Sequence, residues 1–428
     1  MSRALVLRGA DVVDAGGRRR ADVVVADGVV RAVGPDAAAD APVRARVLDV
    51  SGCVVAPGLV DLHAHLRQPG AEEAETVETG GQAAALGGYS AVVAMPNTDP
   101  PVDCAAVAKE VLALGRRSPV EVAVAGAITV GRAGKRLAPM GELAALGVRL
   151  FTDDGAGVQD GALMRRALDY ARGLGVTLAQ HCEDMQLAGA GAMHEGAWSS
   201  RLGLPGVPVA AEEAMVARDI ALVRLTGGRL HFLHLSTAGS VELVGRAKAE
   251  GLSVSAEVTP HHLVLTDAAC AGYDPIFKVS PPLRADHDVA RLRAGLEDGT
   301  IDAIATDHAP HAPEAKDLPF DEAPPGMLGL ETALAVSLSV LDLERALACL
   351  SWRPAAIAGL AARHGGPVAE GAQANLCVID PAATWTVDPA RLASRSRNTP
   401  YAGWTLTGRV RHTIVAGDAV VVDGELVR

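Results

Sequence analysis

The sequence is poor in aromatic residues, and it has no long apolar run. Aromatic residues make up 3% of the 428 residues, although hydrophobic residues make up 49%. A folded core must therefore consist mainly of Ala, Val and Leu, and the chain is long enough to bury a large one. No segment approaches the roughly 20 apolar residues of a membrane span, and the N-terminus has no apolar signal region. We therefore expect a soluble, cytoplasmic protein.

The sequence also lacks extended basic segments and paired cysteines. Its net charge of -12 disfavours nucleic acid or an anionic membrane as a partner. The one sharp basic cluster, Arg18-Arg19-Arg20, is interpreted as a solvated turn. None of the six cysteines forms a CxxC pair, which predicts reduced thiols, as in cytosolic proteins.

A short β-rich run followed by a loop and a helical stretch recurs along the middle of the chain. The helical stretches carry Ala, Leu and Arg, as in 162–174, 212–226 and 241–250. The eight β-rich runs are 54–63, 89–97, 120–128, 147–154, 175–181, 229–235, 252–259 and 301–307. Eight such alternations predict an α/β fold, a (β/α)8 TIM barrel, whose functional groups lie at the C-terminal ends of its strands.

Both ends of the chain have a different pattern. Residues 1–53 contain short alternating strands joined by Asp-Gly and Gly-Gly turns, and residues 374–380 and 409–422 repeat this pattern. We predict a small β-sandwich domain built from both termini. The domains would then be 1–53 and 366–428 for the β-domain and 54–365 for the catalytic barrel. Two separate terminal hairpins are the alternative.

Candidate metal ligands follow the β-rich runs. His63 and His65 end an apolar run, and residues two apart on a strand share a face, so both imidazoles can approach one metal ion. Alone, this pair also fits two surface histidines. However, ligand-type residues end four further runs, namely Asp153 or Asp154, His181, His234 and Asp307. This recurrence predicts a metal site at one rim. His231, three residues before His234, is expected to face the opposite side and to pack against a helix.

The motifs of the chain, taken in order, resemble those of one family. They are Pro57–Arg67, Met95–Thr98, Phe151–Gly155, His181–Asp184, His234–Thr237, Thr259–Leu263, Lys278–Arg284, Ala305–His311 and Asn398–Pro400. Together they resemble the dihydroorotases of the larger, β-domain-bearing type, within the cyclic amidohydrolase family. The resemblance runs nearly from end to end. It implies reversible, metal-dependent hydrolysis of (S)-dihydroorotate to N-carbamoyl-L-aspartate in pyrimidine biosynthesis.

The resemblance also implies a metal centre. Two divalent ions would share a hydroxide as nucleophile, and zinc suits this set of histidines and carboxylates. His63, His65 and Asp307 would bind one ion, and His181 and His234 the second. Many relatives bridge the ions with a carbamylated lysine, but this chain has Asp153-Asp154 in place of a lysine. We choose Asp154 as the bridge because its spacing from His181 matches the family, and Asp153 is the alternative.

Further roles follow from the same resemblance. Asp307 would act as general base and then as general acid. Arg67 would bind the substrate carboxylate, and a surface ion pair is the alternative for this residue. The remaining expected substrate contacts are His65, Asn97, Ser280, His311, Pro325 and Gly326. Ser280 departs from the family, which has Asn there, and residues 309–328 resemble a long loop over the site.

Two other functions are alternatives to dihydroorotase activity. The chain could hydrolyse another cyclic ureide or imide, as a dihydropyrimidinase-like enzyme does. It could also be a non-catalytic scaffold, although it retains every expected metal ligand. The resemblance further implies a homodimer, with aspartate transcarbamoylase as a candidate partner.

Overall fold

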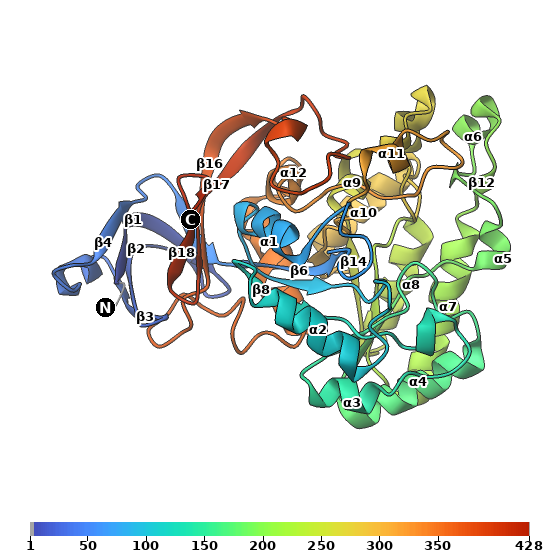
Figure 1. Ribbon diagram of the computed structural model, residues 1–428, viewed down its shortest axis with the longest axis horizontal. Coiled ribbons are helices and arrows are strands. Elements are labelled where there is room, and N and C mark those ends of the chain that lie inside the picture. The colour runs from blue at the N-terminus through green and yellow to red at the C-terminus, as the bar shows by residue number, and fades with distance from the viewer. Residues whose placement is uncertain (1–3, 428) are drawn as a thin grey trace.

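The computed structural model describes residues 4–427 and combines a terminal β-sheet with an α/β region (Figure 1). Blue N-terminal and red C-terminal strands lie side by side in the sheet (Figure 1). Its nine strands are β1 (Leu5–Asp14), β2 (Gly17–Ala26), β3 (Val29–Gly34), β4 (Arg46–Asp49), β5 (Val54–Pro57), β16 (Leu376–Thr386), β17 (Thr405–Val415), β18 (Asp418–Val422) and β19 (Glu425–Leu426).

β5 joins the two ends of the chain. It pairs in parallel with β1 and antiparallel with β16, which gives the order β19-β18-β17-β16-β5-β1-β2-β3, with β4 beside β1. The sheet therefore contains both termini, and the alternative of two separate hairpins is wrong. We expected these strands to form a small sandwich. Because β5 pairs on both of its sides, all nine strands belong to one hydrogen-bonded sheet. Arg18, Arg19 and Arg20 lie on β2, so their interpretation as a turn is also wrong.

The core of this sheet consists of β-branched residues from both ends of the chain. Val12, Val23, Val55, Val378 and Ile414 are all 0% exposed and belong to one cluster. Such residues pack well on a pleated surface. Burial of apolar side chains thus holds the two termini together.

The apolar run expected as one strand, 54–63, is two strands. β5 belongs to the terminal sheet, and β6 (Leu59–Ala64) begins the α/β region. Gly58 lies between them, where an added Cβ would come within 2.5 Å of the Ser90 Cβ atom. Residues 54–57 therefore pair with the terminal strands, and the expected domain boundary after residue 53 lies too early. Both strands are buried, and β6 begins with two apolar residues, so hydropathy does not reveal the break.

Each of the eight expected β-rich runs contains a strand of the α/β region. One parallel sheet contains β6, β7 (Tyr89–Ala94) and β8 (Glu121–Val124). The other contains β9 (Leu150–Phe151), β10 (Thr177–Gln180), β13 (Leu230–Phe232), β14 (Val254–Val258) and β15 (Ala303–Ile304). Two short strands, β11 (Met193–His194) and β12 (Gly206–Val207), pair outside these sheets.

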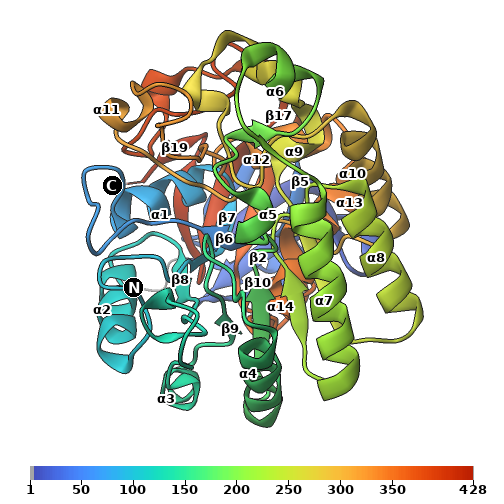
Figure 2. The same cartoon turned by 90° about the vertical axis from the view of Figure 1, so that its right-hand side faces the viewer.

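Helices follow most of the strands, and the three expected helical stretches are confirmed. They are α4 (Gly161–Leu174), α7 (Ala210–Thr226) and α8 (Ala238–Ala249), and α7 and α8 lie side by side on the outer surface (Figure 2). The other α-helices are α1 (Val77–Leu86), α2 (Ala105–Gly115), α3 (Met140–Ala145), α5 (Met185–Ala188), α6 (Ala197–Leu202), α9 (Pro260–Val264), α10 (Asp286–Asp298), α11 (Pro313–Lys316), α12 (Ala333–Leu338), α13 (Leu343–Leu347) and α14 (Arg353–Ile357). Within residues 4–427, no helix combines the length and apolarity needed to cross a membrane.

We expect Ile414→Ala to destabilise the protein by about 2–5 kcal/mol, because it leaves a cavity in the core shared by the two termini. Ile414→Val should cost only about 0.5–1.5 kcal/mol. Urea unfolding measures both free energies. Val43→Ala, at a fully exposed position, is the control and should stay within about 0.5 kcal/mol of the parent. A loss for Ile414→Ala no larger than that of the control would contradict this view of the core.

Candidate active site

The candidate ligands lie at or just beyond the C-terminal ends of the parallel strands. His63 is on β6, and His65 follows this strand directly. The others follow β9, β10, β13 and β15, and they are Asp154, His181, His234 and Asp307. All six side chains are buried. Since parallel strands place their C-terminal ends at one edge, residues far apart in the sequence meet there.

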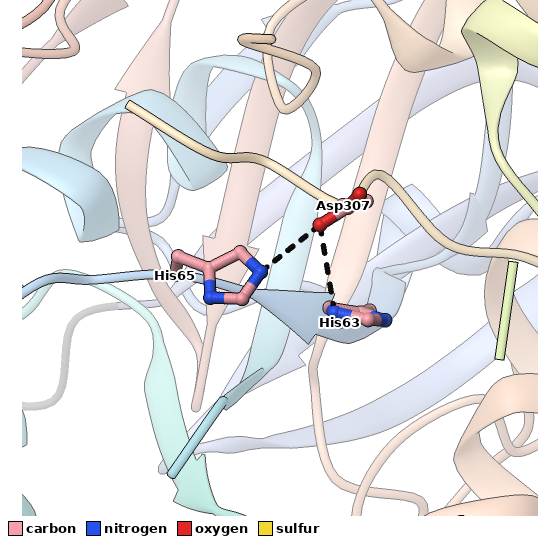
Figure 3. Close-up of side chains that lie close together, drawn as sticks. All are labelled: His63, His65 and Asp307. Atoms are coloured by element: carbon pink, nitrogen blue, oxygen red, sulfur yellow. Dashed lines mark hydrogen bonds and ion pairs between the residues drawn. The ribbon is translucent and has the colours of Figure 1, made fainter. Parts of the chain in front are cut away.

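His63, His65 and Asp307 form one group with metal-ligand spacing. One ligand atom from each lies within 4.8 Å of the other two. Asp307 Oδ1 is 3.0 Å from His65 Nε2 and 3.5 Å from His63 Nε2 (Figure 3). The carboxylate thus points between the two rings, as a third ligand to one ion would.

Asp154 lies between two pairs of histidines. Its Oδ2 atom is 3.4 Å from His63 Nε2 and 3.5 Å from His65 Nε2. Its Oδ1 atom is 3.6 Å from both His181 Nδ1 and His234 Nε2, and these two nitrogens are 3.0 Å apart. His63, Asp154 and His234 form the second group with metal-ligand spacing, so the structure brings His63 into both groups. His181 joins through its contacts with His234 and Asp154.

Asp153 faces away from the histidines. Its Oδ1 atom accepts hydrogen bonds from the backbone N–H groups of Ile128 and Thr129, at 2.9 and 3.0 Å, and its Oδ2 atom accepts one from the Thr129 hydroxyl. Asp153 therefore anchors the loop after β8, while its neighbour Asp154 faces the candidate metal ligands.

The electrostatics of this cluster fit a divalent cation. Burial alone would lower the pKa of His63, but Asp154 and Asp307 raise this pKa well above its ordinary value. Burial alone would raise the pKa of Asp154, but His63, His181 and His234 hold it well below its ordinary value. His63 Nε2 is buried and has no hydrogen-bond partner among the described residues. Imidazole nitrogens and carboxylate oxygens that converge in this way are typical ligands of zinc and similar metals.

Two further side chains orient the histidines of the His63–His65 pair. Asn97 Oδ1 lies 2.9 Å from His65 Nδ1, and Asn97 also donates to Asp154 Oδ2 at 3.4 Å. Glu257, on β14, has its Oε1 atom 3.0 Å from His63 Nδ1. The sequence interpretation missed Glu257. The signal was an acidic residue within the run 252–259, which was predicted to be a strand of the barrel. A buried charge needs partners, so a glutamate there indicates a polar contact in the core.

His231 does not pack against a helix as expected. Its ring is 0% exposed, and its Nε2 atom lies 2.9 Å from Glu257 Oε2. The expectation assumed that side chains alternate between faces from His231 to His234. This assumption fails because His234 has a φ of 30°, outside the extended conformation. His262, which follows β14, has hydrogen bonds to the Thr259 hydroxyl and to the Pro281 carbonyl.

A cavity of about 200 Å³ opens above the candidate ligands. All seven expected substrate residues line it, namely His65, Arg67, Asn97, Ser280, His311, Pro325 and Gly326. Arg67 donates from Nε to the Pro310 carbonyl at 3.0 Å and has no ion pair with any residue that the structure describes. The alternative of a surface ion pair for Arg67 is therefore wrong. Burial and the nearby Arg67 lower the pKa of His311 to about 3, so its ring is neutral near pH 7.

The loop over this cavity is held by polar contacts. Lys316, on α11, donates to the carbonyls of Pro275 and Pro324 at 2.9 and 2.8 Å. Asn398 donates to the carbonyls of Ala309 and Gly326 at 2.9 and 3.1 Å. The C-terminal segment around Asn398 thus helps to shape the cavity wall.

Comparison with known proteins identifies the family. A dihydro-orotase-like family model matches residues 52–240. The chain is 51% identical to the dihydroorotase of Anaeromyxobacter dehalogenans, with 99% of each chain covered. It is 50% identical to the dihydroorotase of Mycobacterium tuberculosis, over 95% of this chain and 96% of the relative. The chain belongs to the dihydroorotase family. The resemblance inferred from the motifs is therefore confirmed.

A solved structure supports the wider cyclic amidohydrolase family. The L-hydantoinase (dihydropyrimidinase) from Arthrobacter aurescens matches with a TM-score of 0.86 and 27% identity, over 100% of this chain and 98% of that chain. Sequence relatives and structural neighbours are thus both cyclic amidohydrolases. The protein is a hydrolase acting on cyclic amides, and its His/Asp groups can bind metal.

The two neighbouring aspartates should respond differently to the same substitution. Asp154→Asn removes the charge between the histidine pairs, so we expect the purified variant to lose bound metal. Asp153→Asn should retain the metal and lose about 1–3 kcal/mol of stability, because its amide cannot accept all the bonds that the carboxylate accepts. Metal analysis and urea unfolding measure the two effects. Loss of metal from the Asp153 variant alone would reverse the assignment.

Proposed function

We propose that this member of the dihydroorotase family catalyses reversible hydrolysis of (S)-dihydroorotate to N-carbamoyl-L-aspartate, a step of pyrimidine biosynthesis. The observation that carries the proposal is the position of Arg67 in the same cavity wall as the candidate metal ligands His65, Asp154 and Asp307. A cyclic amide that bears a carboxylate can reach both. A dihydropyrimidinase-like function is not favoured, because relatives of about 50% identity are named dihydroorotases and the hydantoinase is 27% identical.

The proposal includes a closed (β/α)8 barrel as the scaffold of the site. Two isolated parallel bridges support closure, because they link the two parallel sheets at both edges. One joins Gly126, after β8, to Phe151 on β9, and the other joins His308, after β15, to Ala64 on β6. With Gly58 as the crossing point, the barrel would cover about residues 58–365. The terminal sheet would then comprise the segments before and after it.

We further propose that the site holds two divalent metal ions, with zinc as the metal. His63, His65 and Asp307 would hold one ion, and His181 and His234 the other, with Asp154 between them. The distances and the unpartnered nitrogen of His63 described above support this division. When bound, such ions polarise the amide carbonyl and lower the pKa of water.

Residues of the protein would bind the substrate and transfer the proton. Arg67 presents a planar guanidinium to the substrate carboxylate, with Asn97 and His311 beside it in the cavity. Ser280, Pro325 and Gly326 would contact the ring. Asp307 would accept a proton from the attacking water and deliver it to the ring nitrogen as the amide bond breaks. Burial would raise the pKa of Asp307, but His63 and His65 keep it below its usual range, so the carboxylate is ionised and able to accept that proton.

Asp307→Asn tests the proton transfer. The amide cannot accept the proton, so we expect kcat to fall by about 100-fold or more. Steady-state hydrolysis of dihydroorotate gives kcat, and metal analysis of the same sample separates loss of the base from loss of the ions. Near-normal turnover in the purified variant would remove Asp307 from this role.

Substrate comparison tests the function itself. We expect kcat/KM to be higher for dihydroorotate than for dihydrouracil or hydantoin, which lack the carboxylate. Arg67→Met should lower kcat/KM for dihydroorotate by about 10- to 100-fold, the effect of losing one charge-assisted hydrogen bond, and should change hydrolysis of dihydrouracil little. Arg67→Lys, which retains the charge, is the matched control. A preference for dihydrouracil in the parent protein would refute the proposed substrate.

Assembly remains a prediction from the family resemblance, and location remains a prediction from the composition of the sequence. We propose a homodimer in the cytoplasm and retain aspartate transcarbamoylase as a candidate partner. Sedimentation velocity of the purified protein, alone and with that enzyme, would test both associations. A monomer that does not bind the transcarbamoylase would refute them.

A further inference from the structure

Glu257 is a buried carboxylate that touches residues of both groups with metal-ligand spacing. It is 0% exposed on β14. Its Oε1 atom lies 3.0 Å from Nδ1 of His63, a member of both groups. The same oxygen accepts the backbone N–H of His234, a member of the second group, at 3.4 Å. One oxygen atom therefore contacts the side chain of one candidate ligand and the backbone of another.

The contact with His63 determines which ring nitrogen is available to a metal. An imidazole binds a metal through an unprotonated nitrogen, and a carboxylate beside the other nitrogen retains the proton there. Glu257 lies at Nδ1, so Nε2 is the nitrogen available to a metal. Nε2 is also the nitrogen that faces Asp154 and Asp307, at 3.4 and 3.5 Å.

The contact with His234 supports a backbone that most residues avoid. His234 has a φ of 30°, in the left-handed region that is costly for a residue with a Cβ atom. This turn ends β13 and directs the His234 ring towards Asp154. The hydrogen bond from its N–H group to Glu257 helps to hold the turn in place.

The second carboxylate oxygen of Glu257 is also hydrogen-bonded. Its Oε2 atom lies 2.9 Å from His231 Nε2, and His231 Nδ1 lies 2.8 Å from the Ser255 hydroxyl. A continuous line of hydrogen bonds therefore runs from Ser255 through His231 and Glu257 to His63. With both oxygens bonded, the carboxylate cannot rotate away from His63 without leaving a buried donor unpaired.

We propose that Glu257 is a positioning residue for metal binding, which sets the tautomer of His63 and the backbone position of His234, and that His231 holds it in place. This inference rests on the metal site of the proposed function. None of the motifs that carried the family resemblance contains Glu257 or His231. Their role follows from the contacts of β13 and β14 beneath the ligands.

Titration of the metal-stripped protein with Zn²⁺ against a chromogenic chelator tests the proposal without measuring activity. Glu257→Ala removes the acceptor, and we expect the affinity for zinc to fall by about 10- to 100-fold. Glu257→Gln retains an acceptor for His63 and can donate to His231 if that ring changes its tautomer. It should therefore lose less affinity than the Ala variant, a partial rescue that a purely structural defect would not produce.

Glu212→Ala is the matched control. Glu212 is another buried glutamate, 3% exposed, and it accepts hydrogen bonds from the backbone N–H groups of Ser236 and Thr237 at 3.1 Å. This variant should lower the thermal midpoint but leave the affinity for zinc within about threefold of the parent. Stability loss and loss of metal affinity are thereby separated.

The outcomes distinguish this inference from the proposed function. If the parent protein fails to bind zinc, the proposed metal site is wrong. If the parent binds zinc and Glu257→Ala binds it within about threefold of the parent, Glu257 has no positioning role. If the Ala variant does not fold, Glu257→Gln decides alone, and an affinity equal to that of the parent overturns the inference.

Discussion

The contact on which the site depends is that of the Asp154 carboxylate with two pairs of histidines. Each of its oxygens lies within 3.6 Å of ring nitrogens from two histidines. A buried carboxylate is costly without partners, and a cluster of buried imidazoles is costly without negative charge. The two requirements offset each other only if strands from distant parts of the sequence end at the same place. The relative positions of the strand ends are therefore tightly constrained at this rim.

Other buried carboxylates hold the chain next to the ligands. Asp61 accepts hydrogen bonds from the backbone N–H and hydroxyl of Thr306, the residue before Asp307. Asp153 anchors the loop beside Asp154 in the same way. Glu257 contacts the His63 ring and the His234 backbone N–H group and helps to hold both in position. None of these three carboxylates lines the cavity. The result is a preorganised site, in which the ligand positions do not rely on loops alone.

Much of this arrangement could be predicted from sequence patterns. The β-rich runs indicated the strands because each is short, apolar and followed by a helical stretch. The His63-Ala64-His65 spacing indicated a metal-binding pair because strand residues two apart share a face. The division of the run 54–63 could not be predicted, since residues 54–60 on both sides of the break are apolar. The partner of His231 could not be predicted either, because alternation along the strand stops where His234 adopts a positive φ.

The sequence by itself determined the kinds of groups available, namely the histidines and aspartates at the strand ends, the arginine in the following loop and the family to which they belong. Only the tertiary structure decided that Asp154 faces the histidines while Asp153 faces the backbone, and that Glu257 reaches both His63 and His231. The reason is physical. Residue types and their spacing reflect local backbone geometry, whereas a hydrogen bond between side chains on separate strands depends on how those strands are placed beside each other.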